Sequence, residues 1–262
     1  EIGSGLVGSE MCIRDRLNTI STYMRMLRCI YNRGVDMHQT PYVHRMFRDV
    51  FTGIDTRQKK AIPINELHTL LNEDPQSDKL RRTQAIANLL FLFCGMPFVD
   101  LAYLEKSNLE GNMLKYNRAK TGIPMNVEIL DSAATIISQL RNKHTTVLPE
   151  HPDYLFYILS GKNKRSDEAG YKEYQSALRC FNNDLKSLAR KLCIRSSVTS
   201  YTFRHSWATT AKYRGVPIEM ISESLGHKSI KTTQIYLKGF ELSERTKVNR
   251  LNYSYVMNFK TI

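Results

Sequence analysis

Three side chains in the last quarter of the chain could together carry out chemistry on a phosphodiester. Arg204 follows Tyr201, His227 lies in a Leu-Gly-His-Lys-Ser stretch, and Tyr236 comes nine residues later. A tyrosine hydroxyl is a weak nucleophile near neutral pH. It becomes effective when fixed cations hold a phosphate in line and neutralise the charge that develops. The pattern therefore indicates a reaction that proceeds through a tyrosine nucleophile.

The charge of the chain favours a polyanionic partner. Its 262 residues include 38 Lys and Arg against 25 Asp and Glu, which gives a formal net charge of +13. An excess of this size favours nucleic acid over charge that serves solubility alone, which is the alternative. No run of about 18 apolar residues predicts a membrane span. We therefore expect a partner such as double-stranded DNA, and no membrane.

The cysteines indicate a reducing compartment. There are five of them, an odd number, scattered along the chain without a CxxC pair or a Cys/His metal spacing. Several lie in apolar helical patterns, so we expect buried, reduced thiols in a cytoplasmic protein without a metal site. The five are Cys12, Cys29, Cys94, Cys180 and Cys193.

Composition divides the chain into four segments. The stretch from Leu6 to Arg16 resembles the translation of a transposon-type sequencing adapter, so we expect residues 1–16 not to be native and to lie outside the fold. Residues 17–50 begin with a basic amphipathic helix, and residues 51–60 behave as a linker. Residues 61–262 contain the remaining elements and a C-terminal tail.

Apolar residues recur at helical spacing through most of residues 61–262. Two short apolar stretches flank Lys120-Thr121-Gly122 and predict a β-hairpin with strands at Met113–Arg118 and Asn126–Leu130. Ser77 and Asp131 are placed to cap helices. The fold class is therefore mainly α with a small antiparallel β-sheet. The predicted helices are Ile64–Leu71, Ser77–Cys94, Pro97–Leu104, Asp131–Asn142, Lys172–Leu192, one ending at Gly215, Ile218–Leu225 and Leu242–Tyr253. Lys228–Tyr236 is predicted to be another helix or a tight extended turn.

These motifs resemble a known family. The stretch from about Ala61 to Tyr253 is similar to the catalytic domain of tyrosine recombinases, also called phage integrases. The Arg204-His205 pair, the Leu225-Gly226-His227 turn and Tyr236 match the family in type, order and spacing. The resemblance also implies that residues 17–50 are a remnant of the helical core-binding domain that precedes the catalytic domain.

The resemblance implies a complete reaction. Tyr236 would attack a DNA phosphate, form a 3′-phosphotyrosyl bond and free a 5′-hydroxyl. Because that bond stores the energy of the phosphodiester, rejoining would need no ATP, no metal and no other cofactor. The chain would be the integrase of a mobile element, of the branch found on conjugative transposons. It would act as a homotetramer on paired DNA sites, with the C-terminal tail exchanged in trans.

Each matched residue then has an expected role. Arg204 would present a bidentate fork to the non-bridging oxygens, which a lysine cannot copy. His227 would hydrogen-bond the phosphate or assist proton movement. Lys120 would protonate the leaving 5′-oxygen. The competing interpretations are a surface salt bridge for Arg204, a capping role for His227 and a core aromatic at Tyr236.

Two positions depart from the family's pattern. Tyr201 stands where the family usually has histidine; a phenol can donate a hydrogen bond to phosphate but is a poor base near pH 7. Pro97 stands where the family's first arginine would fall, and losing one preorganised donor commonly costs about 10²–10³ in rate. Asp100, at the place of the family's supporting carboxylate, either holds the lysine hairpin or is an exposed acid in the first turn of a helix.

Further basic residues are candidates for contacts with the DNA backbone, which position a protein without reading sequence. Two other functions remain open: a non-catalytic DNA-binding relative, in which Pro97 records the loss of catalysis, and a relaxing topoisomerase. The candidate DNA-binding residues are Arg25, Arg28, Arg118, Lys228 and Lys231.

Overall fold

The computed structural model describes residues 17–53, 61–141, 152–163, 165–237 and 242–257. It divides the chain into two compact units, Glu1–Gln58 and Lys59–Ile262. The expected adapter-derived segment lies outside the described residues. Within the described ranges no helix combines the length and apolar character needed to cross a bilayer.

The described residues of the first unit, 17–53, form one helix with a loop folded back on it. Helix α1 spans Leu17–Asp36. The hydroxyl of Tyr31 donates to the carbonyl of Pro41 at 3.0 Å and accepts from the amide of Val43 at 2.6 Å. The Tyr31 ring also packs against Phe47, with centroids 5.8 Å apart. These contacts fix the loop even though α1 leaves several large apolar side chains exposed.

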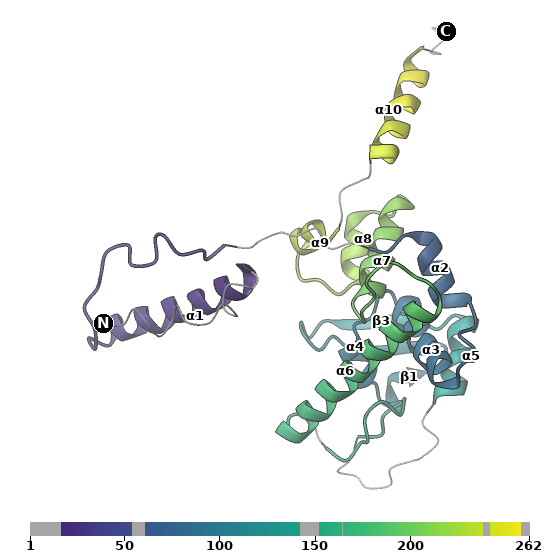
Figure 1. Ribbon diagram of the computed structural model, residues 1–262, viewed down its shortest axis with the longest axis horizontal. Helices are drawn as coiled ribbons and strands as arrows, with labels where there is room; N and C mark the ends of the chain where they lie inside the picture. The colour runs from purple at the N-terminus through teal and green to yellow at the C-terminus, as the bar shows by residue number, and fades with distance from the viewer. Residues whose placement is uncertain (1–16, 54–60, 142–151, 164, 238–241, 258–262) are drawn as a thin grey trace. The chain divides into compact units, whose positions relative to one another are not determined.

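The second unit is mainly helical with one small sheet, which confirms the predicted fold class (Figure 1). Several helices extend a few residues beyond or short of the predicted ranges, as is usual at helix ends. The helices are α2 (Ile64–Asn72), α3 (Asp78–Leu92), α4 (Phe98–Ala102), α5 (Asp131–Leu140), α6 (Glu168–Lys191), α7 (Thr202–Tyr213), α8 (Ile218–Ser224), α9 (Ile230–Tyr236) and α10 (Leu242–Met257), with a 3₁₀ turn at Lys106–Asn108.

The sheet contains the predicted hairpin and one strand that the sequence did not indicate. Strands β2 (Met113–Asn117) and β3 (Pro124–Glu128) pair antiparallel, with Asn117 opposite Pro124. The second strand thus begins two residues before the predicted Asn126. Strand β1 (Leu109–Glu110) adds a short edge to β2. Alternate side chains of β2 and β3 are buried, so one face of the hairpin packs on the core.

Of the two predicted caps, Ser77 is confirmed in position and Asp131 is wrong by one residue. Ser77 occupies the N-cap position of α3, but its side chain makes no capping hydrogen bond. Asp131 is the first helical residue of α5, and Leu130 is at the N-cap. At that position the carboxylate still lies in the first turn, where the helix dipole favours a negative charge.

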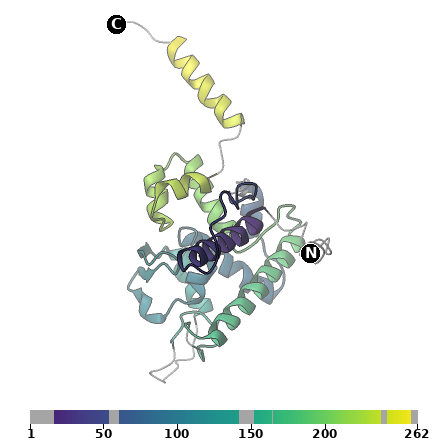
Figure 2. The same cartoon turned by 90° about the vertical axis from the view of Figure 1, so that its left-hand side faces the viewer.

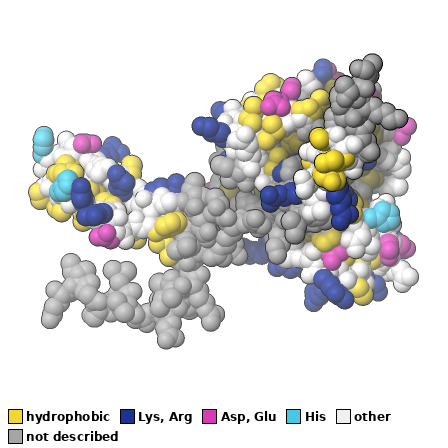
Figure 3. Space-filling model, turned by 90° about the horizontal axis from the view of Figure 1, so that it is seen from above, with side chains coloured by type: hydrophobic (Ala, Val, Ile, Leu, Met, Phe, Trp, Pro, Cys, Tyr) yellow, Lys and Arg dark blue, Asp and Glu magenta, His cyan; other side chains and the backbone are white. Residues whose placement is uncertain are grey.

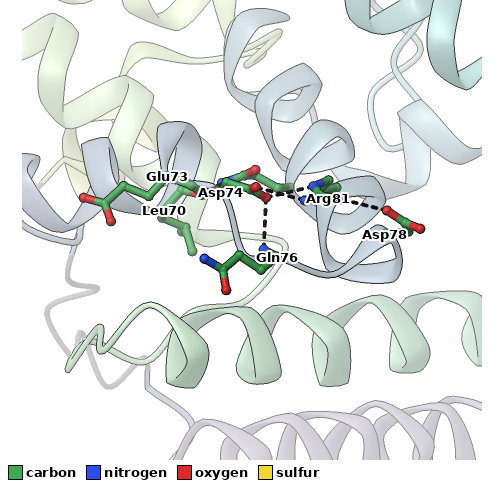
Figure 4. Close-up of polar contacts among 7 residues, drawn as sticks. Leu70, Glu73, Asp74, Gln76, Asp78 and Arg81 are labelled. Carbon is green, nitrogen blue, oxygen red and sulfur yellow. Dashed lines mark hydrogen bonds and ion pairs between the residues drawn. The ribbon is translucent and has the colours of Figure 1, made fainter.

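The loop before α3 is held by an ionic network on the surface (Figure 4). Asp74 accepts hydrogen bonds from the side chain of Arg81 at 2.8 Å and from the amide of Gln76 at 3.0 Å. Arg81 also donates to Asp78 at 2.7 Å. The bond from Arg81 is the main reason that the pKa of Asp74 is lowered to about 2.

The main core lies where α3 and α6 pack together, and α6 runs along one side of the unit in both ribbon views (Figures 1 and 2). Leu89 and Leu90 of α3 and Leu185 of α6 are fully buried. Phe98 of α4 stacks on Phe181 of α6, with ring centroids 4.7 Å apart. The apolar stripes predicted on α3 and α6 are therefore confirmed.

A smaller apolar cluster joins α7 to α8. Ala208, Ile221 and Leu225 are buried together, with Trp207 packed against them. Figures 1 and 2 both show α7, α8 and α9 grouped together. This cluster sets the position of α7 relative to the turn after α8, where the candidate catalytic residues lie.

The cysteines do not form a buried set. Cys29, Cys180 and Cys193 are exposed, and Cys94 is partly buried; all four are free thiols. The expectation of buried thiols is therefore wrong for these three, because each lies on the solvent side of its segment. Cys12 lies outside the described residues.

The packing of α3 on α6 predicts a large loss of stability from a cavity. Leu185→Ala should lower the free energy of unfolding by about 2–5 kcal/mol, because the removed side chain is fully buried. Lys186→Ala, at the exposed neighbouring position, should change it by less than about 0.5 kcal/mol. Urea denaturation of both variants measures the difference, and equal losses would contradict this account of the core.

Candidate active site

Arg204 is buried and held by backbone carbonyls of two other segments. It is the third residue of α7, and only 1% of it is exposed. Nη1 donates to the carbonyl of Gly95 at 3.0 Å, and Nη2 donates to the carbonyl of Leu225 at 2.5 Å. Because a buried charge is costly unless it is hydrogen-bonded, these contacts are what keeps the guanidinium in place. A surface salt bridge is therefore excluded for Arg204.

Gly95 allows the segment after α3 to lie directly on α7. Its φ is +68°, and a Cβ added there would lie 2.9 Å from Cα of Arg204. A side chain at this position would meet both a strained backbone and a backbone collision. The close approach is what brings the Gly95 carbonyl within reach of Arg204.

His227 is neutral and lies between Arg204 and α9. Nε2 accepts from Nη2 of Arg204 at 3.2 Å, which leaves Nδ1 to carry the proton and donate to the hydroxyl of Thr233 at 2.8 Å. Burial, together with the charges of Arg204, Arg118 and Lys120, lowers the pKa of His227 to about 4. At neutral pH the imidazole is therefore uncharged, and it orients Arg204.

The hairpin turn with Lys120 is fixed on both sides of the lysine. The amide of Ala119 donates to Oδ1 of Asp100 at 2.9 Å, and the hydroxyl of Thr121 donates to the carbonyl of Gly226 at 3.3 Å. Lys120 itself is exposed. The turn thus presents an exposed ammonium beside the 225–227 turn, close enough to affect the pKa of His227.

Asp100 holds the lysine hairpin, so the alternative of an exposed acid is excluded. It lies in the first turn of α4 and is 5% exposed. Burial raises its pKa, while the Ala119 amide and the charge of Arg118 act in the opposite direction. Pro97 is the N-cap residue of α4 and is itself buried. It provides no cation.

Arg118 is not a surface residue, which corrects its grouping with the exposed basic residues. Only 5% of it is exposed, and Nη1 lies 3.3 Å from Oδ2 of Asp100. Its side chain lies against Gly226, where an added Cβ would be 2.8 Å from Cγ. The position of Arg118 two residues before Lys120 is the one feature of the sequence that sets it apart from the other arginines.

Two candidate tyrosines remain, Tyr201 and Tyr236. Tyr201 is the N-cap residue of α7 and is 42% exposed, with its ring edge-on to His205 at 5.3 Å. The buried His205 packs beneath it, in agreement with a structural role. Tyr236 is the last residue of α9, three residues after Thr233, and its side chain lies outside what the structure describes.

The structure thus brings Arg204, His227, Asp100, Arg118 and the Lys120 turn together. The other four basic candidates are exposed, as expected for contacts with a nucleic acid backbone. Among the described residues, no group of three or more His, Cys, Asp or Glu side chains could hold a metal ion. The four exposed candidates are Arg25, Arg28, Lys228 and Lys231.

Comparison with known proteins identifies the family of this chain. Residues 60–241 match the phage integrase family, and the chain therefore belongs to that family of tyrosine recombinases. It is 30% identical over 195 residues to tyrosine recombinase XerA of Pyrococcus furiosus, which covers 74% of this chain and 62% of that protein. The chain thus spans less than two thirds of the length of that relative.

A second relative and a solved structure give the same result. Tyrosine recombinase XerD of Listeria monocytogenes is 24% identical over 226 residues, covering 83% of this chain and 70% of that protein. The integrase of the Tn1549 transposon, solved in complex with circular intermediate DNA, superposes with a TM-score of 0.59. That match has 14% identity and covers 91% of this chain and 80% of the other. At this identity the likeness shows the fold.

The contact between Gly226 and Arg118 generates a steric prediction. In Gly226→Ala the new Cβ would lie 2.8 Å from Cγ of Arg118 and 2.9 Å from Sδ of Met125, at a φ of +62°. We expect a loss of about 1 kcal/mol from backbone strain and about 1–3 kcal/mol more from the collision. Urea denaturation measures the sum of the two losses.

Gly215→Ala is the matched control, because Gly215 also follows a helix with a positive φ, +77°, but an added Cβ meets no atom within 4 Å. It should lose only the strain energy. If the free energy of unfolding falls by the same amount in the two variants, the side chain of Arg118 does not pack against Gly226.

The neutral state of His227 predicts a pH dependence of stability. The unfolded imidazole has a pKa of 6.5 and the folded one a pKa of about 4, so between these values the unfolded chain takes up a proton that the folded chain does not. Stability should therefore fall as the pH falls through that window. His227→Gln should remove this part of the pH dependence in thermal unfolding.

The exposed His68 provides the control, since His68→Gln should leave the slope with pH as it is in the wild type. A wild-type slope retained in His227→Gln would mean that His227 is not held neutral by its surroundings.

Proposed function

We propose that this protein is a site-specific DNA recombinase that cuts and rejoins DNA through a tyrosine nucleophile. The observation that carries the proposal is the buried Arg204, oriented against His227 by hydrogen bonds from two segments far apart in sequence. A guanidinium fixed this firmly is preorganised for charge that develops on a phosphate. Membership of the phage integrase family supports the same reaction.

In the proposed reaction the hydroxyl of Tyr236 attacks the phosphorus of the scissile phosphate. The new bond joins the tyrosine oxygen to phosphorus, the bond from phosphorus to the 5′-oxygen breaks, and the electron pair leaves with that oxygen. The tyrosine loses one proton and the 5′-oxygen gains one, so the step is balanced. Rejoining is the reverse attack by a 5′-hydroxyl, and it needs neither ATP nor a metal ion.

Proton movement in this reaction falls to Lys120 and His227. The exposed Lys120 would deliver a proton to the leaving 5′-oxygen. His227 is neutral, but its Nε2 lone pair accepts from Arg204. When the Nη2 N–H that now donates to His227 donates to a phosphate oxygen instead, that lone pair becomes able to accept the tyrosine proton. Tyr201, exposed at the start of α7, the helix that carries Arg204, would donate a hydrogen bond to the phosphate.

Double-stranded DNA is the proposed partner. The net charge is +13, and Lys and Arg side chains lie on the face of each unit that Figure 3 shows. Arg25, Arg28, Lys228 and Lys231 are exposed and would contact backbone phosphates. The solved integrase of Tn1549, with the same fold, was captured on DNA.

We further propose that the protein integrates or excises a mobile element as a homotetramer. Helix α10 leaves a set of large apolar side chains exposed, more than an isolated surface helix needs. Docking of α10 on a neighbouring subunit, in trans, would bury them and link cleavage to assembly. The exposed residues are Val248, Leu251, Tyr253, Val256 and Met257.

One observation favours a second candidate, a DNA-binding relative with impaired catalysis. Pro97 stands where the family's first arginine would fall, and it offers no donor to a phosphate. Such a protein would bind DNA in a salt-dependent way without forming a covalent adduct. The two candidates differ in the single property of covalent trapping.

Trapping on a nicked suicide substrate tests the proposal. The wild type should form a covalent adduct with DNA that resists denaturation, because the nicked strand diffuses away and rejoining is blocked. Tyr236→Phe should form none, and mass spectrometry should map the adduct to Tyr236. Addition of a chelator should leave the yield unchanged.

Tyr213→Phe is the matched control, since Tyr213 is an exposed tyrosine at the end of α7. It should form adduct as the wild type does. Salt-dependent DNA binding without any adduct in the wild type would replace the proposed function by the second candidate.

A further inference from the structure

Two nitrogens of the Arg118 guanidinium have no hydrogen-bond partner among the described residues. These are Nε and Nη1, and both are buried. Nη1 lies 3.3 Å from Oδ2 of Asp100, but Oδ2 likewise accepts no hydrogen bond from a described residue. A buried donor that stays unsatisfied costs about 1–3 kcal/mol, and more for a charged group. Arg118 therefore has donor capacity that the fold does not use.

Arg118 and Arg204 approach the same turn from different elements. Cγ and Cδ of Arg118 lie against Gly226. The residues on either side of that glycine hold Arg204, through the carbonyl of Leu225 and through Nε2 of His227. The two arginine side chains thus approach the same turn, the charges of both lower the pKa of His227, and both residues are nearly buried, at 5% and 1% exposed.

A phosphate at this position needs more donors than Arg204 provides alone. In the attack on phosphorus two non-bridging oxygens gather negative charge, and each is stabilised by fixed N–H groups. Arg204 already donates to three protein acceptors, Gly95, Leu225 and His227. The unused Nε–H of Arg118 lies on the edge of the planar guanidinium that it shares with Nη2, and such an edge suits a phosphate oxygen.

We propose that Arg118 is the second guanidinium of the phosphate site and donates to a non-bridging oxygen of the scissile phosphate. It takes over, from the β2–β3 turn, the donor that Pro97 cannot supply from α4. Asp100 pairs with Nη1 of Arg118, and the Nε–H remains available for the substrate. The inference rests on the proposed recombinase function.

Access to both guanidinium groups comes from the hairpin. The Lys120 turn covers the 225–227 turn and is tied to it by the hydrogen bond from Thr121 to Gly226. That bond is 3.3 Å long and Thr121 is only partly buried, so DNA would lift the turn by breaking this bond and the contacts of Ala119 and Arg118 with Asp100. Arg204 stays on α7 when the turn lifts, and the return of the turn brings Arg118 onto the admitted phosphate.

The alternative is that Arg118 only steadies the hairpin through its pairing with Asp100. A methylphosphonate at the scissile position distinguishes the two, because it replaces one charged non-bridging oxygen by a methyl group. The suicide substrate is prepared with phosphate and with each of the two methylphosphonate isomers. Adduct formation at Tyr236 is then measured for the wild type, Arg118→Ala and Arg118→Lys.

We expect Arg118→Ala to slow adduct formation about 10²–10³-fold on the phosphate substrate, as for the loss of one preorganised donor. On one methylphosphonate isomer it should react at nearly the rate of the wild type, since the oxygen that Arg118 serves is absent. Arg118→Lys keeps a charge opposite Asp100 and should lose rate on phosphate because the fork is gone. Thermal unfolding reports whether each variant folds.

Arg81→Ala is the matched control, because Arg81 is also paired with aspartates but lies exposed at the start of α3. It should match the wild type on all three substrates. Equal slowing of both Arg118 variants on all three substrates, or no slowing on phosphate, overturns the inference. If the wild type forms no adduct at all, the proposed function fails instead.

Discussion

The arrangement of this site depends on one glycine turn that keeps two arginine side chains close together. Like charges repel, so two buried guanidinium groups stay close only if each is anchored separately. Gly226 lets Arg118 pack against the backbone, while its neighbours Leu225 and His227 accept from Arg204. The same crowding of positive charge adds to the effect of burial and keeps His227 neutral, with a pKa of about 4. A third positive charge is thereby avoided.

The two arginines are neutralised in different ways, and this explains the local structure around them. Arg204 is held by the carbonyls of Gly95 and Leu225, and the missing side chain of Gly95 lets its own segment approach the backbone of Arg204 closely. Arg118 is held by Asp100, a carboxylate whose own burial raises its pKa. A buried ion pair contributes little net stability, although removing one partner is costly. The role of the pair is therefore to fix the position of the hairpin, because Asp100 also accepts a hydrogen bond from the amide of Ala119, next to Lys120.

Sequence patterns predicted the parts of this molecule that depend on local spacing. The apolar stripes of α3 and α6, the hairpin around Lys120 and the order Arg204, His227, Tyr236 all follow from residues close together in the chain. Strand β1 was missed because two residues are too short to give an alternating pattern. The burial of Arg118 was missed for another reason: it depends on Gly226, which is remote in sequence. Asp100 could not be decided either, since a first-turn acid and a buried anchor look alike in sequence.

With Arg118 as a phosphate ligand, two catalytic tasks belong to one mobile element. Arg118 and Lys120 are two residues apart on the same turn, and Asp100 ties that turn to α4 at Ala119, between them. An arginine at position 97 would have remained on α4 when the hairpin moved, so only the proton donor would have been withdrawn. In this chain, lifting the turn withdraws both the proton donor, Lys120, and the hydrogen bond from Arg118 to the phosphate. Since each such contact contributes about 10²–10³ in rate, the position of the hairpin controls cleavage more sharply than a lysine alone would.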